Sequence, residues 1–216
     1  MSSLGDGLSW LVDEAHWQGE DGFPHRMLEH LGYTALTVAI AAVIALPLGL
    51  WIGHTGRGKG LAVMASGALR ALPTLGLLTL IVLWQGIGLM PPITALVVLA
   101  IPPLLAGAYA GLEAIDRRTI DAARAVGMTE WQILAKVEVP LATHLIVGGF
   151  RSAFLQVIAT ATVAAYVGLG GLGRYLIDGL AVRDYPQMVA GSIMMIVLAL
   201  VLDTLLVGVQ RLAPRT

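Results

Sequence analysis

The chain has 216 residues, of which 57% are hydrophobic and 12% are charged, and it contains no cysteine. Its mean hydropathy of +0.81 is far above that of a soluble domain, so the lipid bilayer is the expected solvent. The formal net charge of −1 provides no basic field for nucleic acid, and the absence of cysteine excludes disulfides and thiolate metal sites.

Residues 1–30 form an acidic segment in which six carboxylates accompany a single base, Arg26. A cleavable signal peptide starts with the opposite charge, so we expect no cleavage. Two alternatives remain open for this segment. Trp10 and Trp17 would anchor an amphipathic stretch on the outer leaflet, or the segment would be a flexible arm.

Five apolar segments follow and predict an all-α membrane protein whose transmembrane domain covers residues 31–211. They are residues 31–52, 61–84, 92–111, 141–166 and 187–209. Each is long enough to cross about 30 Å of hydrocarbon as a helix. Backbone groups in hydrocarbon must be paired within helices or a closed barrel, and the alternating strands of a barrel are not seen. A bundle of five transmembrane helices is therefore expected.

The basic residues predict the orientation of this bundle. Eight lie on one side, namely Arg57, Lys59, Arg117, Arg118, Arg124, Lys136, Arg211 and Arg215, and the other side has Arg26, Arg174 and Arg183. The positive-inside rule then places the N-terminus outside and residues 212–216 as a cytoplasmic tail. The expected location is the cytoplasmic (inner) membrane.

Several polar residues fall within or at the rims of the spans, where a charge must reach the interface, pair or face water. Arg70 either snorkels or lines a pathway, whereas pairing or a wet cavity is favoured for Arg151. Asp203 is a possible partner of either arginine. Pro73 and the nearby hydroxyl and amide groups can bend helices and offer a polar wall, although threonines often bond only their own helix. The candidate translocation path is Arg70, Pro73, Thr74, Arg151, Gln156, Thr160 and Thr162.

The polar segment over residues 113–140 is predicted to be a helix, a glycine turn and a second helix. Helix formers over residues 120–126 stop at Gly127, which suits a left-handed position after a helix. Thr129 and Gln132 form a capping-box pattern that would start a short helix through Lys136, and Pro140 suits the first turn of the next span. Possible apolar contacts are Val126, Met128, Trp131 and Ile133. The alternative is an amphipathic segment lying on the headgroups, with Trp131 as its anchor.

The spacing of Asp121-Ala122-Ala123, Gly127 and the sequence ending at Pro140 resembles the EAA loop of importer-type ABC permeases. Asp121 replaces the usual glutamate of that family. The resemblance implies that the loop fits a cleft on a separate ATPase subunit. Its coupling residues would be Asp121, Ala122, Ala123, Arg124, Gly127, Met128 and Pro140, with Ala122, Ala123, Arg124, Gly127 and Met128 as the docking surface. The chain has no P-loop, so it is not expected to be an enzyme, and ATP and Mg are expected on the partner.

A second set of residues is similar to the permeases for glycine betaine, choline and related osmoprotectants. It comprises residues 149–154, 158–162, 168–173 and 178–180 with Asp184. Methionine permeases share parts of this layout, so methionine or another amino-acid-like solute is the alternative substrate. Gly168, Gly170, Gly171 and Gly173 would form an outer gate or a plain extracellular turn.

The expected partners follow from the size and composition of the chain. One five-span subunit is too small to enclose a pathway, so a second permease copy or a homologue is implied, beside a dimer of ATPase subunits and membrane lipid. The aromatic residues are scattered rather than gathered into a cage, which favours selection by an extracytoplasmic binding protein.

Two other classes of protein are alternatives to this interpretation. An ATP-independent secondary transporter or channel would be supported by internal repeats, which are not found. An intramembrane enzyme would need His144, Ser152 and Asp203 on a recognised spacing, which they lack. The other histidines, His16, His25, His30 and His54, show no zinc-ligand spacing.

Overall fold

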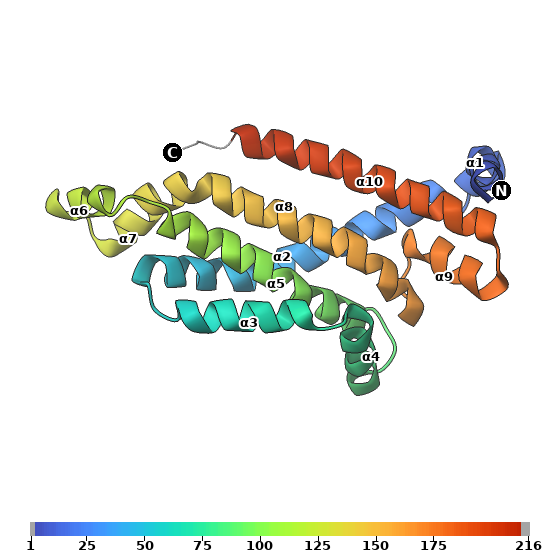
Figure 1. Ribbon diagram of the computed structural model, residues 1–216, viewed down its shortest axis with the longest axis horizontal. Helices are drawn as coiled ribbons and strands as arrows, with labels where there is room; N and C mark the ends of the chain where they lie inside the picture. Colours follow the sequence, from blue (N-terminus) through green and yellow to red (C-terminus); the bar gives the residue numbers. More distant parts are fainter. Residues whose placement is uncertain (1–2, 213–216) are drawn as a thin grey trace. The chain divides into compact units, whose positions relative to one another are not determined.

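The computed structural model describes residues 3–212, which form helices and contain no strand, as the sequence predicts (Figure 1). The elements are α1 (Ser3–Val12), η1 (Glu14–Trp17), α2 (Phe23–Thr55), α3 (Lys59–Ala71), α4 (Thr74–Gln85), α5 (Met90–Glu113), α6 (Arg117–Ala125), α7 (Glu130–Ile133), η2 (Leu134–Glu138), α8 (Val139–Ala164), η3 (Ala165–Val167), α9 (Gly173–Val182) and α10 (Tyr185–Leu212). Most of the predicted cytoplasmic tail, including Arg215, lies outside the described residues.

Four helical segments are long and apolar enough to cross a membrane. They are α2, α5, the continuous segment Glu130–Val167 that contains α8, and α10. The expected uninterrupted span over residues 61–84 is instead a pair of helices, α3 and α4, bent by 90°. The bend follows from Pro73, which has an extended backbone (ψ 121°) and disfavours a helical residue before it. This pair makes the fifth span if it is counted as one.

The first span begins earlier than the sequence suggested. α2 starts at Phe23 rather than at residue 31, so residues 23–30 belong to a helix and not to a separate acidic segment. Phe23 is fully buried, and this burial stabilises the additional turns. Arg26 and Glu29 therefore lie on the same helix as the apolar span.

The N-terminal segment is ordered and packed, which disagrees with a flexible arm. Trp10 stacks on His16 with ring centroids 3.4 Å apart and meets Phe23 and Tyr175 edge to face. The Tyr175 hydroxyl donates to the carbonyl oxygen of Asp21 at 2.5 Å, and burial raises the pKa of Tyr175 to about 12. Tyr175 therefore stays a neutral hydrogen-bond donor near pH 7.

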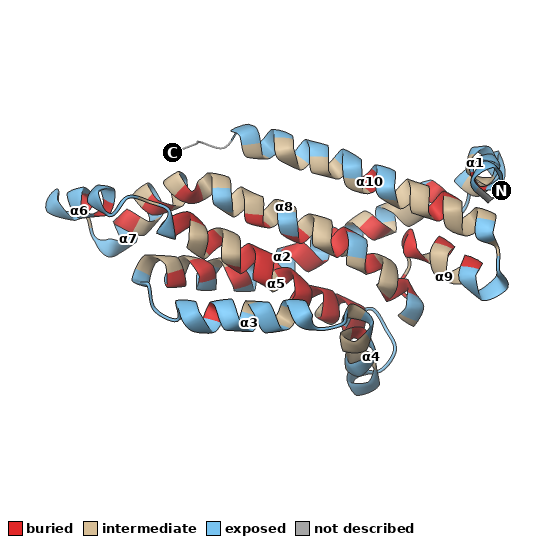
Figure 2. Ribbon diagram, in the orientation of Figure 1, coloured by how far each residue is buried: buried red, intermediate tan, exposed pale blue. Residues whose placement is uncertain are grey.

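The chain divides into two compact units. Unit 1 contains the residues up to Thr37 together with residues 72–99 and 155–202, and unit 2 contains residues 38–71, 100–154 and those from Asp203 onward. An apolar cluster of unit 1 consists of Phe23, Leu172, Tyr175, Ala190 and Leu198. Figure 2 shows buried residues on α2, α5 and α8, whereas α10 is largely exposed or half-buried.

Glycines let the helices of unit 2 approach closely. A Cβ added to Gly107 of α5 would lie 2.7 Å from the Cα of Gly149 on α8, and one added to Gly49 of α2 would lie 2.6 Å from the Cβ of Ala108. Small residues at helix crossings permit this kind of backbone contact in membrane proteins. The crossings hold α2 against α5 and fix the ends of α5 and α8, from which the α6–α7 loop, residues 113–140, extends.

Candidate functional site

The first half of the α6–α7 loop has the predicted helix and turn. The Asp116 side chain caps α6 by accepting a hydrogen bond from the Arg118 amide at 2.9 Å, and α6 ends at Ala125. Gly127 has a φ of +88°, so the left-handed position expected there is confirmed. A Cβ added to Gly127 would meet nothing within 4 Å. Glycine is therefore required by the backbone conformation rather than by lack of space.

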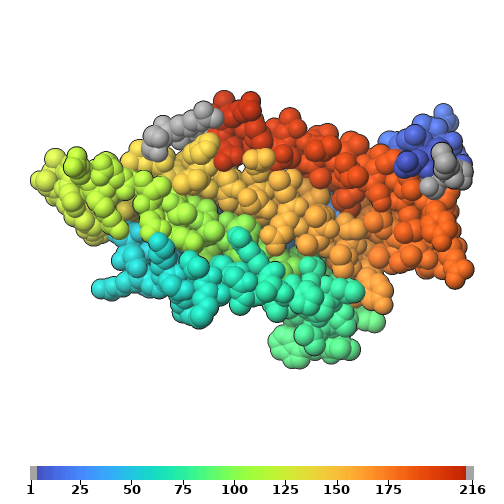
Figure 3. Space-filling view, in the orientation of Figure 1, coloured from blue at the N-terminus to red at the C-terminus, as the bar shows by residue number. Residues whose placement is uncertain are grey.

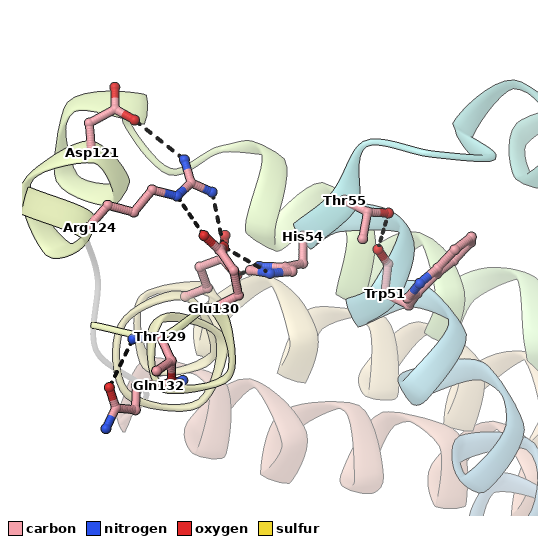
Figure 4. Close-up of polar contacts among 9 residues, drawn as sticks. Trp51, His54, Thr55, Asp121, Arg124, Thr129, Glu130 and Gln132 are labelled. Atoms are coloured by element: carbon pink, nitrogen blue, oxygen red, sulfur yellow. Dashed lines mark hydrogen bonds and ion pairs between the residues drawn. The ribbon is translucent and has the colours of Figure 1, made fainter. Parts of the chain in front are cut away.

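The second half begins with the predicted capping box (Figure 4). The Gln132 amide donates to the Thr129 hydroxyl at 3.3 Å, and the Thr129 amide donates to the Gln132 side chain at 2.9 Å. The second helix does not end at Lys136 as expected. It continues through the π-helical segment η2 into α8, which has Pro140 in its first turn. The loop is therefore joined to a membrane span without an intervening coil.

The α6–α7 loop has a small apolar core of its own. Ile120, Ala123 and Ile133 are buried, and Met128 packs against them together with Ile115 and Val137. Because Ala123 faces this core, the expectation that it lies on a docking surface is wrong. Val126 and Trp131 are 79% and 75% exposed, so these two are the large apolar side chains that the loop exposes. The space-filling view shows the loop surface in yellow-green (Figure 3).

A chain of polar contacts connects the loop to the end of α2 (Figure 4). Arg124 donates to both carboxylate oxygens of Glu130, at 2.8 and 3.0 Å, and these bonds raise the pKa of the guanidinium. Arg124 also reaches Asp121 at 3.4 Å. On its other side Glu130 meets Nε2 of His54 at 3.3 Å, and Nδ1 of His54 lies 2.5 Å from the buried Glu138.

Sequence reasoning did not find His54 or Glu138. The signal available was a carboxylate between Val137 and Val139, in a segment that is otherwise apolar, and a histidine at the end of a span. Nothing in the sequence indicates that these two positions, which are far apart along the chain, meet. The contact depends on the tertiary fold of unit 2.

Arg151 of α8 and Asp203 of α10 form an ion pair within the membrane-spanning helices. Arg151 Nε and Nη2 donate to the two carboxylate oxygens at 2.6 and 3.1 Å. Both side chains are about one-third exposed. Of the readings left open by the sequence, pairing of Arg151 with Asp203 is the one observed. Arg70 is exposed in the last turn of α3.

The uncharged residues of the candidate path belong to unit 1. Gln156 donates to the Leu99 carbonyl at 2.9 Å, and Thr160 donates to the carbonyl of Gln156 at 2.8 Å. Thr160 therefore bonds its own helix, which was the alternative reading of the threonines. Thr162 is half-buried on α8, while Pro73 precedes α4 and Thr74 is its first residue.

The glycine-rich turn, residues 168–173, is tightly packed in unit 1. Gly168 and Gly171 have φ values of +90° and +86°. Glu29 of α2 accepts a hydrogen bond from the Gly171 amide at 2.9 Å and one from Arg26 at 2.7 Å. A Cβ on Gly170 would lie 2.5 Å from a Glu29 carboxylate oxygen. This carboxylate therefore holds the turn against the first span.

Two neighbouring features of unit 1 were also missed by sequence reasoning. His30 is buried, and its Nε2 donates to the Ile158 carbonyl at 3.0 Å, which ties α2 to α8. The segment after the glycine-rich turn forms α9, which the apolar spans did not predict. Within residues 3–212, no group of three or more His, Asp or Glu residues is placed to hold a metal ion.

Comparison with known proteins decides the family. The model of the family described as binding-protein-dependent transport system inner membrane component matches residues 45–215. The chain belongs to this family. It is a membrane-spanning permease subunit of an ABC importer, as the loop spacing suggested.

The permease has curated relatives over most of its length. It is 34% identical to the osmoprotectant import permease protein OsmW of Salmonella typhimurium, with 95% of each chain covered. It is 30% identical to the glycine betaine/carnitine/choline transport system permease protein OpuCB of Bacillus subtilis. The alignment covers 85% of this permease and 84% of the relative. Both relatives are transport proteins, so the interpretation as a transport subunit is confirmed.

Solved structures share the fold. The permease matches a chain of the inward-facing MetNI methionine ABC transporter with a TM-score of 0.76 and 23% identity, over 87% of this permease and 94% of that chain. An amino acid ABC transporter structure matches with a TM-score of 0.71 and 21% identity, over 88% and 92%. At these identities the likeness concerns the fold alone, and it confirms the predicted helical permease bundle.

Proposed function

We propose that the permease carries an osmoprotectant such as glycine betaine, choline or a related quaternary ammonium compound. The observation that carries this proposal is the identity of 30–34% with permeases named for those solutes, over 85% or more of the chain. The residues from 149 to 184 that resemble osmoprotectant permeases support the same substrate class.

Uptake by the reconstituted importer tests the substrate. The permease is co-purified with its ATPase and placed in liposomes with its binding protein, and uptake of labelled glycine betaine, choline and methionine is compared with and without ATP. ATP-dependent uptake of glycine betaine or choline is expected. Methionine uptake without either of these solutes would refute the osmoprotectant proposal while leaving the importer intact, and ATP-independent uptake would favour a secondary transporter.

The α6–α7 loop is proposed to couple this permease to a dimer of separate ATPase subunits, which bind ATP and Mg. Its outward residues are Ala122, Arg124, Val126, Gly127 and Trp131, and these would contact the partner. Ala123, Met128 and Pro140 would act by shaping the loop, and Asp121 by its contact with Arg124. A second permease copy or homologue would complete the pathway, and an extracytoplasmic protein would deliver the solute.

The orientation follows from the positive-inside rule and is proposed with the N-terminus outside and the C-terminus in the cytoplasm. The chain has no native cysteine, so a single introduced cysteine can be labelled without background from other thiols. Gly5→Cys is expected to react with an impermeant thiol reagent in intact cells, whereas Thr216→Cys is expected to be protected. Labelling of the C-terminal thiol would reverse the assignment.

The polar residues along the membrane helices are proposed to line the solute pathway, and the glycine-rich turn is proposed to close it on the outer side. Arg151, about one-third exposed beside Asp203, and the amide of Gln156 are the groups best suited to a weakly binding wall. Arg70, Pro73, Thr74, Thr160 and Thr162 complete the candidate set. The gate would consist of Gly168, Gly170, Gly171 and Gly173, held by Glu29.

A further inference from the structure

His54 stands at the point where the α6–α7 loop meets the C-terminal end of α2. One ring nitrogen, Nδ1, is 2.5 Å from Glu138, and the other, Nε2, is 3.3 Å from Glu130. The His54 side chain is 14% exposed and that of Glu138 is 5% exposed, so water competes little for their contact. Figure 4 shows the ring directed at the Glu130 carboxylate.

Glu130 connects both helices of the loop, α6 and α7, to α2. Its carboxylate accepts two hydrogen bonds from Arg124 of α6, belongs to the first residue of α7, and faces His54 of α2. Glu138 approaches His54 from η2, a π-helical segment, and such segments occur frequently at functional sites. A single imidazole therefore contacts both ends of the segment that joins the loop to α8.

The chemistry of the ring sets a condition on these contacts. A neutral imidazole has one N–H donor, and only the imidazolium form has two. Two carboxylates facing the two nitrogens can both be hydrogen-bonded only when both nitrogens carry a proton. The charged groups that face His54 are Glu130 and Glu138, and Glu130 is in turn paired with Arg124.

We propose that His54 is a positioning residue whose doubly protonated form holds the α6–α7 loop against the end of α2. When His54 loses a proton, the remaining N–H stays on Nδ1, which is the nitrogen closer to its glutamate, Glu138. The lone pair of Nε2 then faces the Glu130 carboxylate. The loop is then released at Glu130, and coupling to the ATPase weakens as cytoplasmic pH rises. This proposal rests on the proposed coupling function of the loop.

A spin label on the exposed Val126 reports the position of the loop in the full-length permease without any partner. The Val126→Cys chain, labelled and placed in lipid nanodiscs, is compared at about pH 5 and pH 8, the range in which histidines titrate. The ratio of immobilised to mobile label is expected to fall about threefold at the higher pH, as for loss of one partly exposed ion pair.

Three variants separate positioning from general stability. His54→Gln is expected to give a mobile label at both pH values, because the uncharged amide forms no ion pair with Glu130 at either pH. His54→Arg, a permanent cation with several donors, is expected to keep the label immobilised at both. His25→Gln, which changes a half-exposed histidine in the first turn of α2, serves as the matched control and is expected to follow the parent.

A label ratio that does not change with pH in the parent, or a His54→Gln ratio at pH 5 equal to that of the parent at pH 5, would overturn the proposal. Glu130→Gln provides a second route if His54→Gln fails to fold, because it weakens the same contact from the other side and is expected to release the label. Co-purification of the ATPase is measured separately. If no ATPase binds the parent permease, the proposed function fails, and the label still decides the role of His54.

Discussion

The turn of the α6–α7 loop and the glycine-rich turn before α9 use glycine for different physical reasons. Gly127 adopts a φ of +88° with nothing within 4 Å of an added Cβ, so its backbone conformation is what excludes other residues. Gly173 has no such φ, yet an added Cβ would lie 2.4 Å from the Thr162 carbonyl oxygen. The exposed turn therefore depends on conformation alone, whereas the packed turn, in which Gly168 and Gly171 also have positive φ, depends on both conformation and space.

The largest loss of stability is expected from Gly173→Val. The new side chain would overlap the α8 backbone, which cannot yield as a flexible side chain can, so a loss of about 3 kcal/mol or more is expected. Thermal unfolding of the detergent-solubilised permease measures it. The matched control is Gly67→Ala in α3, where an added Cβ meets nothing within 4 Å and helix propensity gives a gain of up to about 1 kcal/mol. Equal melting temperatures for the two variants would refute the steric argument.

Removing the carboxylate that holds the glycine-rich turn should have a smaller, local effect. Glu29→Ala leaves the Gly171 amide without its acceptor and Arg26 with Asp21 alone, which costs about 1.5–3 kcal/mol for hydrogen bonds to a charged group. Faster hydrogen exchange at the Gly171 amide is the expected result. Glu20→Ala, which changes an exposed carboxylate just before α2, should leave that exchange rate unchanged. Exchange at Gly171 that is equally slow in both variants would contradict the role given to Glu29.

At the exposed turn, Gly127→Val tests conformation without steric overlap inside the chain. A branched residue at this φ costs about 1–2 kcal/mol, and the strain should disturb the loop while membrane insertion is unaffected. Gly127→Asn is the control, because asparagine tolerates the left-handed region. ATPase co-purification and binding-protein-stimulated ATP hydrolysis should fall for valine and persist for asparagine. A valine variant with normal stimulated hydrolysis and transport would remove the coupling role from this loop.

The smallest effect, a weaker binding to the ATPase, is expected from charge reversal at Arg124. Arg124→Glu breaks the exposed contacts with Glu130 and Asp121, and it would weaken assembly moderately if the partner presents an acidic rim. Binding to the ATPase, measured at increasing salt, should differ from the parent most at low ionic strength. Arg118→Glu, on the same helix, separates this contact from the general charge of the loop. A salt-independent defect would point to a folding fault instead.

The features that the sequence predicted are mainly local. The left-handed turn at Gly127 and the capping box of Thr129 and Gln132 depend on residues a few positions apart, so spacing was enough to find them. Apolar stretches of span length likewise predicted α2, α5, α8 and α10. The break between α3 and α4 at Pro73 was harder to predict. A proline can bend a helix slightly or end it, and flanking contacts decide between these outcomes.

The features that were missed or left open are long-range. His54 meets Glu138, Glu29 meets Gly171, and Arg151 selects Asp203 only after the helices have packed. Ala123 shows the same limit on a smaller scale. Its motif position suggested a surface role, yet the helical face on which it lies is buried against Ile133, and one sequence alone did not reveal which face α7 would cover.

The π-helical segment η2 sets the angular register between the loop and the membrane span. A π-helical turn contains one residue more than an α-helical turn, and each residue of an α-helix advances the direction of its side chain by about 100°. Deleting Ala135 would let Leu134–Glu138 relax to α-helical geometry, and α7 would then rotate by about that angle about the axis of α8. Glu130 would turn away from His54 although neither side chain had been changed. The one extra residue in η2 therefore determines the direction in which the loop faces.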